Sequence, residues 1–301
     1  MDVIAPGRYI VAVSGGVDSM VLLDMLRGRE DIEVVVVHVN HGVRPDSHED
    51  AALVAAYAQK YHLRYLETSL SLGHGASEAR ARKARYDFLQ QCRKNENARA
   101  IITAHHQDDL LETVLIAIMR GTGWRGLAPF SEQKSVLRPL LSSTKDQLLG
   151  YARKHHVPWR EDSTNTDESY LRNYIRHSLI PMLDQKDGEW QAKFLQKIRK
   201  QQQLRVQIES ELDTWLAARA ALPRYELIML PPEISYEIIQ RACTLYTGNT
   251  LERSLAESAL LFSKVAQPGK VFELGRTWQL RAESANVVVE LRRPMVSFKE
   301  H

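Results

Sequence analysis

To about residue 120, the sequence alternates short apolar runs with longer segments of helical spacing. The first run, Tyr9–Val13, is long enough for one buried strand, and the further strand-like runs are Ile32–Val39, Arg64–Thr68 and Arg99–Ala104. The helical segments cover residues 17–27, 48–61, 76–95 and 106–119. Because helical crossovers join parallel strands, the alternation predicts an α/β fold, a doubly wound and mostly parallel sheet with helices on both faces. Ligands of such sheets bind beyond the carboxyl ends of the strands.

The turn after the first run is unusually polar, reading Ser14-Gly15-Gly16-Val17-Asp18-Ser19. Its glycines let the backbone approach a ligand and adopt positive φ. The helix that begins there presents unpaired N–H groups and a partial positive charge, which favour phosphate. The two serines add hydroxyl donors, and Asp18 is suited to hold Mg²⁺ against phosphate oxygens. A purely structural turn needs less polar equipment, so we interpret residues 14–19 as a phosphate-binding loop, although the sequence holds no Walker lysine motif and no G-x-G-x-x-G after a strand.

Polar segments also follow two other predicted strands, at His38–Arg44 and at His105–Asp109. Three polar strand ends at one sheet edge predict a single site. Two histidines in the first segment invite a zinc hypothesis, but two ligands are too few. Nucleoside contacts by His38 and its neighbours are favoured instead, with Arg44 near phosphate.

The segment after the fourth strand is acidic. Asp109 and Glu112 are three residues apart and share a helix face. Three interpretations stay open: paired carboxylates that grip an amino group, metal or nucleotide contacts by the local His and Asp residues, or capping of the helix. Downstream, Arg120 begins a glycine-containing basic turn that is able to approach an anion.

Basic residues gather on two predicted helices, although the formal net charge is only +3. The groups are Arg80, Arg82, Lys83, Arg85, Arg93 and Lys94, and Lys193, Lys197, Arg199, Lys200 and Arg205. Either group alone fits a solvated helix face, but two beside a nucleotide site favour RNA. Arg172 and Arg176 are four residues apart and share one face of a predicted helix. The pair is either a ridge on the protein surface or a clamp on the nucleic-acid backbone phosphate.

The second part of the sequence predicts a smaller α+β domain. We place the domains at residues 1–184 and 185–301, the latter beginning with a helical linker. Expected helices cover 144–154, a segment from Tyr170 to about Pro181, 189–221, 232–246 and 250–265, with a polar loop at 161–168, a charged linker at 184–188 and strands at 270–274, 277–282 and 286–291. No apolar run is long enough to cross a membrane, and the amino terminus is unlike a signal peptide. Cys92 and Cys243 are far apart, which argues against a disulfide framework or a cysteine-held cluster and favours a cytoplasmic compartment.

Residues 14–19 resemble the SGGxDS loop of the ATP pyrophosphatases, which hold the β- and γ-phosphates of ATP and cut between α and β. The order of further motifs resembles that of the tRNA(Ile)-lysidine synthetases over residues 8–183, and more weakly to the end, as in a short form without the second C-terminal domain of longer members. The motifs are His38 to Arg44, Glu78 to Tyr86, Thr103 to Thr113, Arg120 to Gly123, Arg138 to Leu141 and Asn165 to Arg176.

This resemblance implies a ligase that uses ATP and Mg²⁺ on a CAU-anticodon tRNA(Ile). ATP adenylates O2 of cytidine 34, and free L-lysine then attacks C2, giving lysidine, AMP and pyrophosphate. It implies a catalytic N-terminal domain and a tRNA-binding C-terminal domain, with a homodimer left open. Implied catalytic residues are Asp18, Asp109 and Glu112, the last two holding lysine and Asp18 the metal. Implied ATP contacts are Ser14, Gly15, Gly16, Val17, Asp18, Ser19, His38 and Arg85, and implied tRNA contacts are Arg44, Arg82, Arg120, Arg172 and Arg176. The alternatives are another tRNA-modifying enzyme of the same superfamily, such as a thiolase, or a non-catalytic RNA-binding protein.

Overall fold

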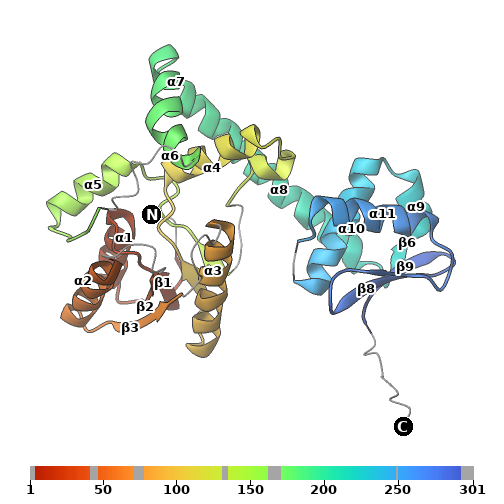
Figure 1. Ribbon diagram of the computed structural model, residues 1–301, viewed down its shortest axis with the longest axis horizontal. Helices are drawn as coiled ribbons and strands as arrows, with labels where there is room; N and C mark the ends of the chain where they lie inside the picture. Colours follow the sequence, from red (N-terminus) through yellow and green to blue (C-terminus); the bar gives the residue numbers. More distant parts are fainter. Residues whose placement is uncertain are drawn as a thin grey trace, which may run out of the picture. The chain divides into compact units, whose positions relative to one another are not determined.

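The computed structural model describes residues 4–40, 47–70, 78–130, 135–161, 171–248 and 250–292. It divides into two units, Met1–Gln203 and Leu204–His301, each of which we describe by itself (Figure 1). None of the helices in these ranges is long and apolar enough to span a membrane.

The first unit is built on a five-stranded parallel sheet. Its strands are β1 (Gly7–Ala12), β2 (Ile32–Asn40), β3 (Arg64–Ser69), β4 (Ala100–Ile102) and β5 (Val136–Leu137), in the order β3-β2-β1-β4-β5. The chain builds outward from β1 through β2 and β3, then returns to the other side of β1 with β4. This reversal between β1 and β4 is where open α/β sheets bind ligands. The predicted doubly wound sheet is confirmed, and β5 is an addition to it.

Helices cover both faces of this sheet, as Figure 1 shows for α1, α2 and α3. They are α1 (Val17–Arg27), α2 (Ser47–Lys60), α3 (Glu78–Asn95), α4 (Gln107–Met119) and α5 (Lys145–Lys154), with a short 3-10 turn, η1 (Trp124–Leu127), after α4. Alternation along β1 explains the two faces: Tyr9 and Val11 are buried in the core that α1, α2 and α5 share, whereas Ile10 packs in a second core with Leu89 of α3. The expected bounds of the first four strands and helices agree with the structure to within two residues.

The helix expected to end around Pro181 continues past it. The chain forms α6 (Leu171–Tyr174), a π-helical turn, η3 (Ile175–Leu179), and then α7 (Ile180–Lys186) without a break. Proline is tolerated because it lies in the first turn of α7, directly after the wider π-helical turn. The expected linker at 184–188 is correspondingly short, since α8 (Trp190–Ala217) begins at residue 190. Most of the expected loop at 161–168 lies outside the described residues.

The second unit pairs a small antiparallel sheet with helices. After the later part of α8 come β6 (Leu222–Pro223), α9 (Arg224–Met229), α10 (Pro232–Thr247), α11 (Arg253–Val265), β7 (Val271–Glu273), β8 (Trp278–Ala282) and β9 (Asn286–Leu291), with sheet order β6-β9-β8-β7. Its core joins Leu227 of α9, Ile239 of α10 and Leu280 of β8. This confirms the smaller α+β domain, while β6 and α9 were not expected. The long helix ends four residues before the expected residue 221.

Candidate active site

The loop after β1 is held in a shape that requires glycine at residue 15. Gly15 has φ of +94°, and a Cβ there would lie 3.2 Å from the Cβ of Asp50. Its carbonyl accepts a hydrogen bond of 3.0 Å from the backbone N–H of Arg160. The positive φ predicted for this glycine turn is confirmed at Gly15, and the turn brings the backbone close to Asp50 of α2.

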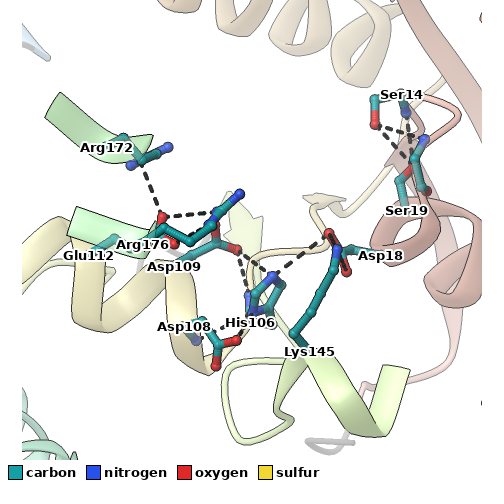
Figure 2. Close-up of polar contacts among 11 residues, drawn as sticks. Ser14, Asp18, Ser19, His106, Asp108, Asp109, Glu112, Lys145, Arg172 and Arg176 are labelled. Atoms are coloured by element: carbon teal, nitrogen blue, oxygen red, sulfur yellow. Dashed lines mark hydrogen bonds and ion pairs between the residues drawn. The ribbon is translucent and has the colours of Figure 1, made fainter. Parts of the chain in front are cut away.

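The two loop serines fasten the loop to the start of α1. The Ser19 hydroxyl donates to the Gly16 carbonyl at 2.9 Å and accepts from the backbone N–H of Ser14 at 3.1 Å. The Ser14 and Ser19 hydroxyls also lie 3.2 Å apart (Figure 2). Gly16 caps α1 without a side-chain hydrogen bond to the first turn. The first N–H groups of α1 thus have no side-chain cap, which is the arrangement expected of a phosphate-binding loop.

Asp18 lies in the first turn of α1 and meets two basic side chains from other elements. Lys145 Nζ is 2.8 Å from Asp18 Oδ1 and 2.9 Å from Oδ2. His106 Nε2 is 3.7 Å from Asp18 Oδ2 and 3.5 Å from Asp109 Oδ2. One imidazole therefore stands between the phosphate-binding loop and the acidic helix α4 (Figure 2).

The start of α4 is a capping box. The His106 ring accepts from the backbone N–H of Asp108 at 3.3 Å, and the Asp109 carboxylate accepts from the backbone N–H of His106 at 3.0 Å. Burial works to raise the pKa of Asp109, but His106 and its amide hold that pKa below the ordinary value. Burial likewise raises the pKa of Asp108. The capping interpretation is confirmed for Asp109, and it leaves the carboxylate room for further contacts.

Glu112 is fully buried and is held by two arginines. Arg176 donates from Nε to Oε1 at 2.7 Å and from a terminal nitrogen to Oε2 at 3.1 Å, and Arg172 Nε lies 3.5 Å from Oε2. Burial raises the pKa of Glu112 despite these charges. The expectation that Asp109 and Glu112 share a face is met, since α4 turns both towards the arginines of α6 and η3 (Figure 2). Arg172 and Arg176, each about one third exposed, thus form a bridge to α4 and not a free ridge.

His105 packs against an aromatic side chain and lies close enough to Asp109 and to nearby arginines for their charges to affect its pKa. Its Nδ1 is 2.8 Å from the Thr103 hydroxyl, and its ring centroid is 4.9 Å from that of Phe130. Burial, with smaller contributions from Arg138, lowers the pKa of His105 to about 3. The ring is therefore neutral at physiological pH.

Three arginines, Arg138, Arg82 and Arg85, lie close enough to His105 for their charges to lower its pKa. The Arg138 guanidinium stacks on Phe130 at 4.8 Å, and its buried Nε has no hydrogen-bond partner among the described residues. Arg82 and Arg85 lie over the ring of Tyr86 at 5.2 and 5.8 Å. The basic group of α3 thus turns in part towards the site.

Three other expected residues are less central. His38 is buried, with Nδ1 2.8 Å from the Val13 carbonyl, so it lies beside the end of β1. Arg120 is the exposed residue that caps the carboxyl end of α4. Arg44 lies outside the described residues.

The side chains of this site fit a magnesium ion only together with a ligand that supplies further oxygen atoms. The described residues contain no group of three His, Cys, Asp or Glu side chains able to enclose a metal, so the metal interpretation of the His and Asp cluster lacks a protein cage. Magnesium bound to nucleotides needs only one or two carboxylates, with phosphates and water completing its shell. Asp18 at the phosphate-binding loop meets that requirement.

The sequence analysis missed Lys145. Its contact with Asp18 joins residues 127 positions apart, so no local pattern could reveal it. The one available signal was its place at the start of a predicted helix after the Arg138–Leu141 segment.

Comparisons with known proteins agree with this geometry. The tRNA(Ile)-lysidine synthase of Enterococcus faecalis is 30% identical over 297 residues, which cover 90% of this chain and 63% of that protein. The enzyme of the same name from Exiguobacterium sibiricum is 41% identical over 178 residues, 58% of this chain and 43% of the relative. The matched part of this chain therefore spans between 43% and 63% of the length of these relatives.

A solved structure shows the same fold at low identity. The U34-tRNA thiolase NcsA from Methanococcus maripaludis, with its 4Fe-4S cluster, has a TM-score of 0.57 at 14% identity and covers 66% of this chain and 74% of its own. Residues 4–183 match the family model described as the PP-loop domain. Because this match takes in more than half of the chain, with the parallel sheet and the loop at Ser14–Ser19, the chain belongs to the PP-loop domain family.

Proposed function

We propose that this chain is a tRNA(Ile)-lysidine synthase, a carbon–nitrogen ligase that joins free L-lysine to C2 of cytidine 34 in a CAU anticodon at the expense of ATP. One observation carries the proposal: His106 Nε2 lies within 3.7 Å of Asp18 and 3.5 Å of Asp109. The phosphate-binding loop, through Asp18, and Asp109, the more exposed carboxylate of the pair suited to an amine, thus border the same imidazole. The similarity to the tRNA(Ile)-lysidine synthase of Enterococcus faecalis, which covers 90% of this chain, supports the same function.

The first step needs the outer phosphates of ATP held still. Cytidine O2 attacks the α-phosphorus, the bond to the bridging oxygen breaks, and pyrophosphate leaves. Ser14, Ser19 and the N–H end of α1 hold the phosphates, with His38 and Arg85 nearby for the rest of the nucleotide. Asp18 would hold Mg²⁺, which would supply charge neutralisation for the leaving pyrophosphate. Pre-placed donors stabilise developing charge at no reorganisation cost.

The second step needs a lysine aimed at the activated base. The ε-amine attacks C2, AMP leaves with the O2 oxygen, and the amine loses a proton. Asp109 retains 17% exposure of its side chain, whereas Glu112 has none. We therefore assign the direct contact with the lysine amino group to Asp109, with Glu112 joining when Arg176 shifts. Positioning of this kind lowers the barrier by converting an encounter into a local step.

The tRNA contacts belong to the basic residues around this edge. Arg82, Arg120, Arg172 and Arg176 are our candidates among the described residues, together with Arg44. Residues 1–184 would supply the chemistry and residues 185–301 further tRNA contacts. The thiolase alternative has little support, since Cys92 and Cys243 are both buried and belong to different units.

Mass spectrometry of a tRNA(Ile) transcript incubated with the protein, ATP and lysine tests the proposal. We expect the nucleotide at position 34 to gain the mass of lysine less water, and a transcript with uridine at position 34 to gain nothing. An unmodified tRNA that the protein nevertheless binds would favour the non-catalytic alternative. A gain of sulfur would favour a thiolase.

A further inference from the structure

The phosphate-binding loop of this chain contains no basic residue between Ser14 and Ser19. In loops of the Walker type, a lysine within the loop reaches the β- and γ-phosphates. The fold here brings a lysine to the loop from another element, because Lys145 at the start of α5 contacts Asp18. The question is what this ammonium does beside a nucleotide site.

Lys145 occupies the open edge of the Asp18 carboxylate. Its Nζ is almost equidistant from the two oxygens, at 2.8 and 2.9 Å. Because the ammonium contacts both oxygens, Mg²⁺ bound to either of them from this side would lie next to it, and like charges repel at such separations. Mg²⁺ and the ammonium therefore cannot share this edge, so one must move when the other arrives.

The backbone of Lys145 is fixed while its side chain has room to move. Thr144 caps α5 in a capping box, accepting from the backbone N–H of Gln147 at 3.3 Å. The backbone N–H of Lys145 contributes a hydrogen bond that lowers the pKa of Asp108. The Lys145 side chain is 39% exposed. Because the backbone is fixed and the four-carbon side chain is flexible, the ammonium can change direction while it stays near the loop.

A purely structural role, in which the ion pair of Lys145 and Asp18 holds α1 and α5 together, explains this contact poorly. These helices already share the buried core, through Leu23 and Leu148, and Tyr151 donates to the buried Asp24 carboxylate at 2.9 Å. A partly exposed ion pair adds little to such packing. Its position beside the phosphate-binding loop is better explained by a ligand.

We propose that Lys145 is a triphosphate-binding residue, which neutralises Asp18 in the free protein and turns to the β- and γ-phosphates when ATP arrives with Mg²⁺. This inference rests on the ATP use of the proposed function and adds a residue to it. The lysine thereby supplies from α5 the charge that the loop itself lacks. An ammonium offers three donors, which suit phosphate oxygens.

Calorimetric binding of ATP and of AMP, each with Mg²⁺, to the full chain and to Lys145→Met tests the inference. The variant should lose roughly ten-fold or more in ATP affinity, the scale of one lost hydrogen bond to a charged group. Its AMP affinity should be unchanged, because AMP has no β- or γ-phosphate. Lys145→Arg should recover much of the ATP affinity. Lys154→Met, which removes an exposed lysine from the far end of α5, should leave both affinities as they are.

Unchanged ATP affinity in Lys145→Met would overturn the inference, as would an equal loss for ATP and AMP, which is what a merely structural clasp predicts. A wild-type chain that binds no ATP would overturn it too. The proposed function fails by a different result: a chain that binds ATP through Lys145 but never adds lysine to tRNA.

Discussion

At the scale of single residues, the site combines charges of opposite sign at short range. Asp18, Asp109 and Glu112 each meet a basic partner within 3.7 Å. A carboxylate that loses such a partner, or a cation left alone, is costly where water is excluded. Single substitutions here should therefore separate the roles of the groups.

Asp18→Ala should reduce formation of AMP by at least about 100-fold, since one group that stabilises leaving charge is worth that much. Its affinity for tRNA should stay within a factor of about three, because the basic candidates for tRNA contact lie elsewhere. Rates of AMP release and filter binding of labelled tRNA measure the two. Retained AMP formation would remove Asp18 from its proposed role.

Asp109→Asn should raise the KM for lysine by about ten-fold or more, the effect of one charge-assisted hydrogen bond, with a smaller effect on the KM for ATP. Glu112→Gln offers the comparison within the same pair, since its side chain is buried beneath Arg176. Steady-state kinetics with each substrate varied in turn separate the effects. Equal losses for lysine and ATP would assign Asp109 to the nucleotide instead.

His105 should make the protein less stable as the pH falls. Its pKa is lowered to about 3 in the folded chain, whereas the ordinary value in an unfolded chain is about 6.5. The unfolded state binds the proton first, so stability is present above pH 6.5 and is lost progressively as the pH falls towards 3. Urea unfolding at pH 7.5 and 5.5 should show a smaller loss in His105→Gln than in the wild type. Equal losses of stability in the variant and the wild type would mean that a group other than His105 takes up the proton.

At the scale of elements, three helix starts build the site. The N-terminal turns of α1 and α4 present Asp18 and Asp109, and α5 adds Lys145 from the edge of β5. Gly15, with its φ of +94°, lies two residues before the first residue of α1.

Gly15→Ala should destabilise the fold by about 1–2 kcal/mol, the cost of a left-handed backbone for a residue with a Cβ, and should weaken ATP binding. Gly150→Ala is the matched control. It lies within α5 with no neighbour within 4 Å of the added Cβ, so it should stabilise by about 0.5–1 kcal/mol. Thermal unfolding and calorimetry measure both. A harmless Gly15→Ala would show that the turn tolerates a side chain.

The sequence predicted these elements where the signal was local. The four early strands have near-continuous or alternating apolar runs. The glycines and polar residues of 14–19 predict a turn directly. Two-residue strands such as β5 are too short to show a periodic pattern. The helix end predicted around Pro181 was wrong because the preceding π-helical turn depends on packing. The pairing of Lys145 with Asp18, like that of Arg176 with Glu112, follows from the crossover of the sheet and has no sequence pattern of its own.

At the scale of the whole molecule, the first unit contains every described residue that we assign to chemistry, and the second unit has a core of its own. The match to the PP-loop domain ends at residue 183, near the proposed limit of the catalytic segment. The central claim is that the loop at Ser14–Ser19 holds ATP so that its bond between the α- and β-phosphates breaks.

Transfer of label from ATP to tRNA in the absence of lysine tests that claim most directly. With ATP labelled at the α-phosphate, the label should appear on tRNA(Ile), and with ATP labelled at the γ-phosphate it should appear in pyrophosphate. Formation of labelled inorganic phosphate and ADP in place of these products would contradict the account, because it would mean that the chain cuts ATP at the other bond.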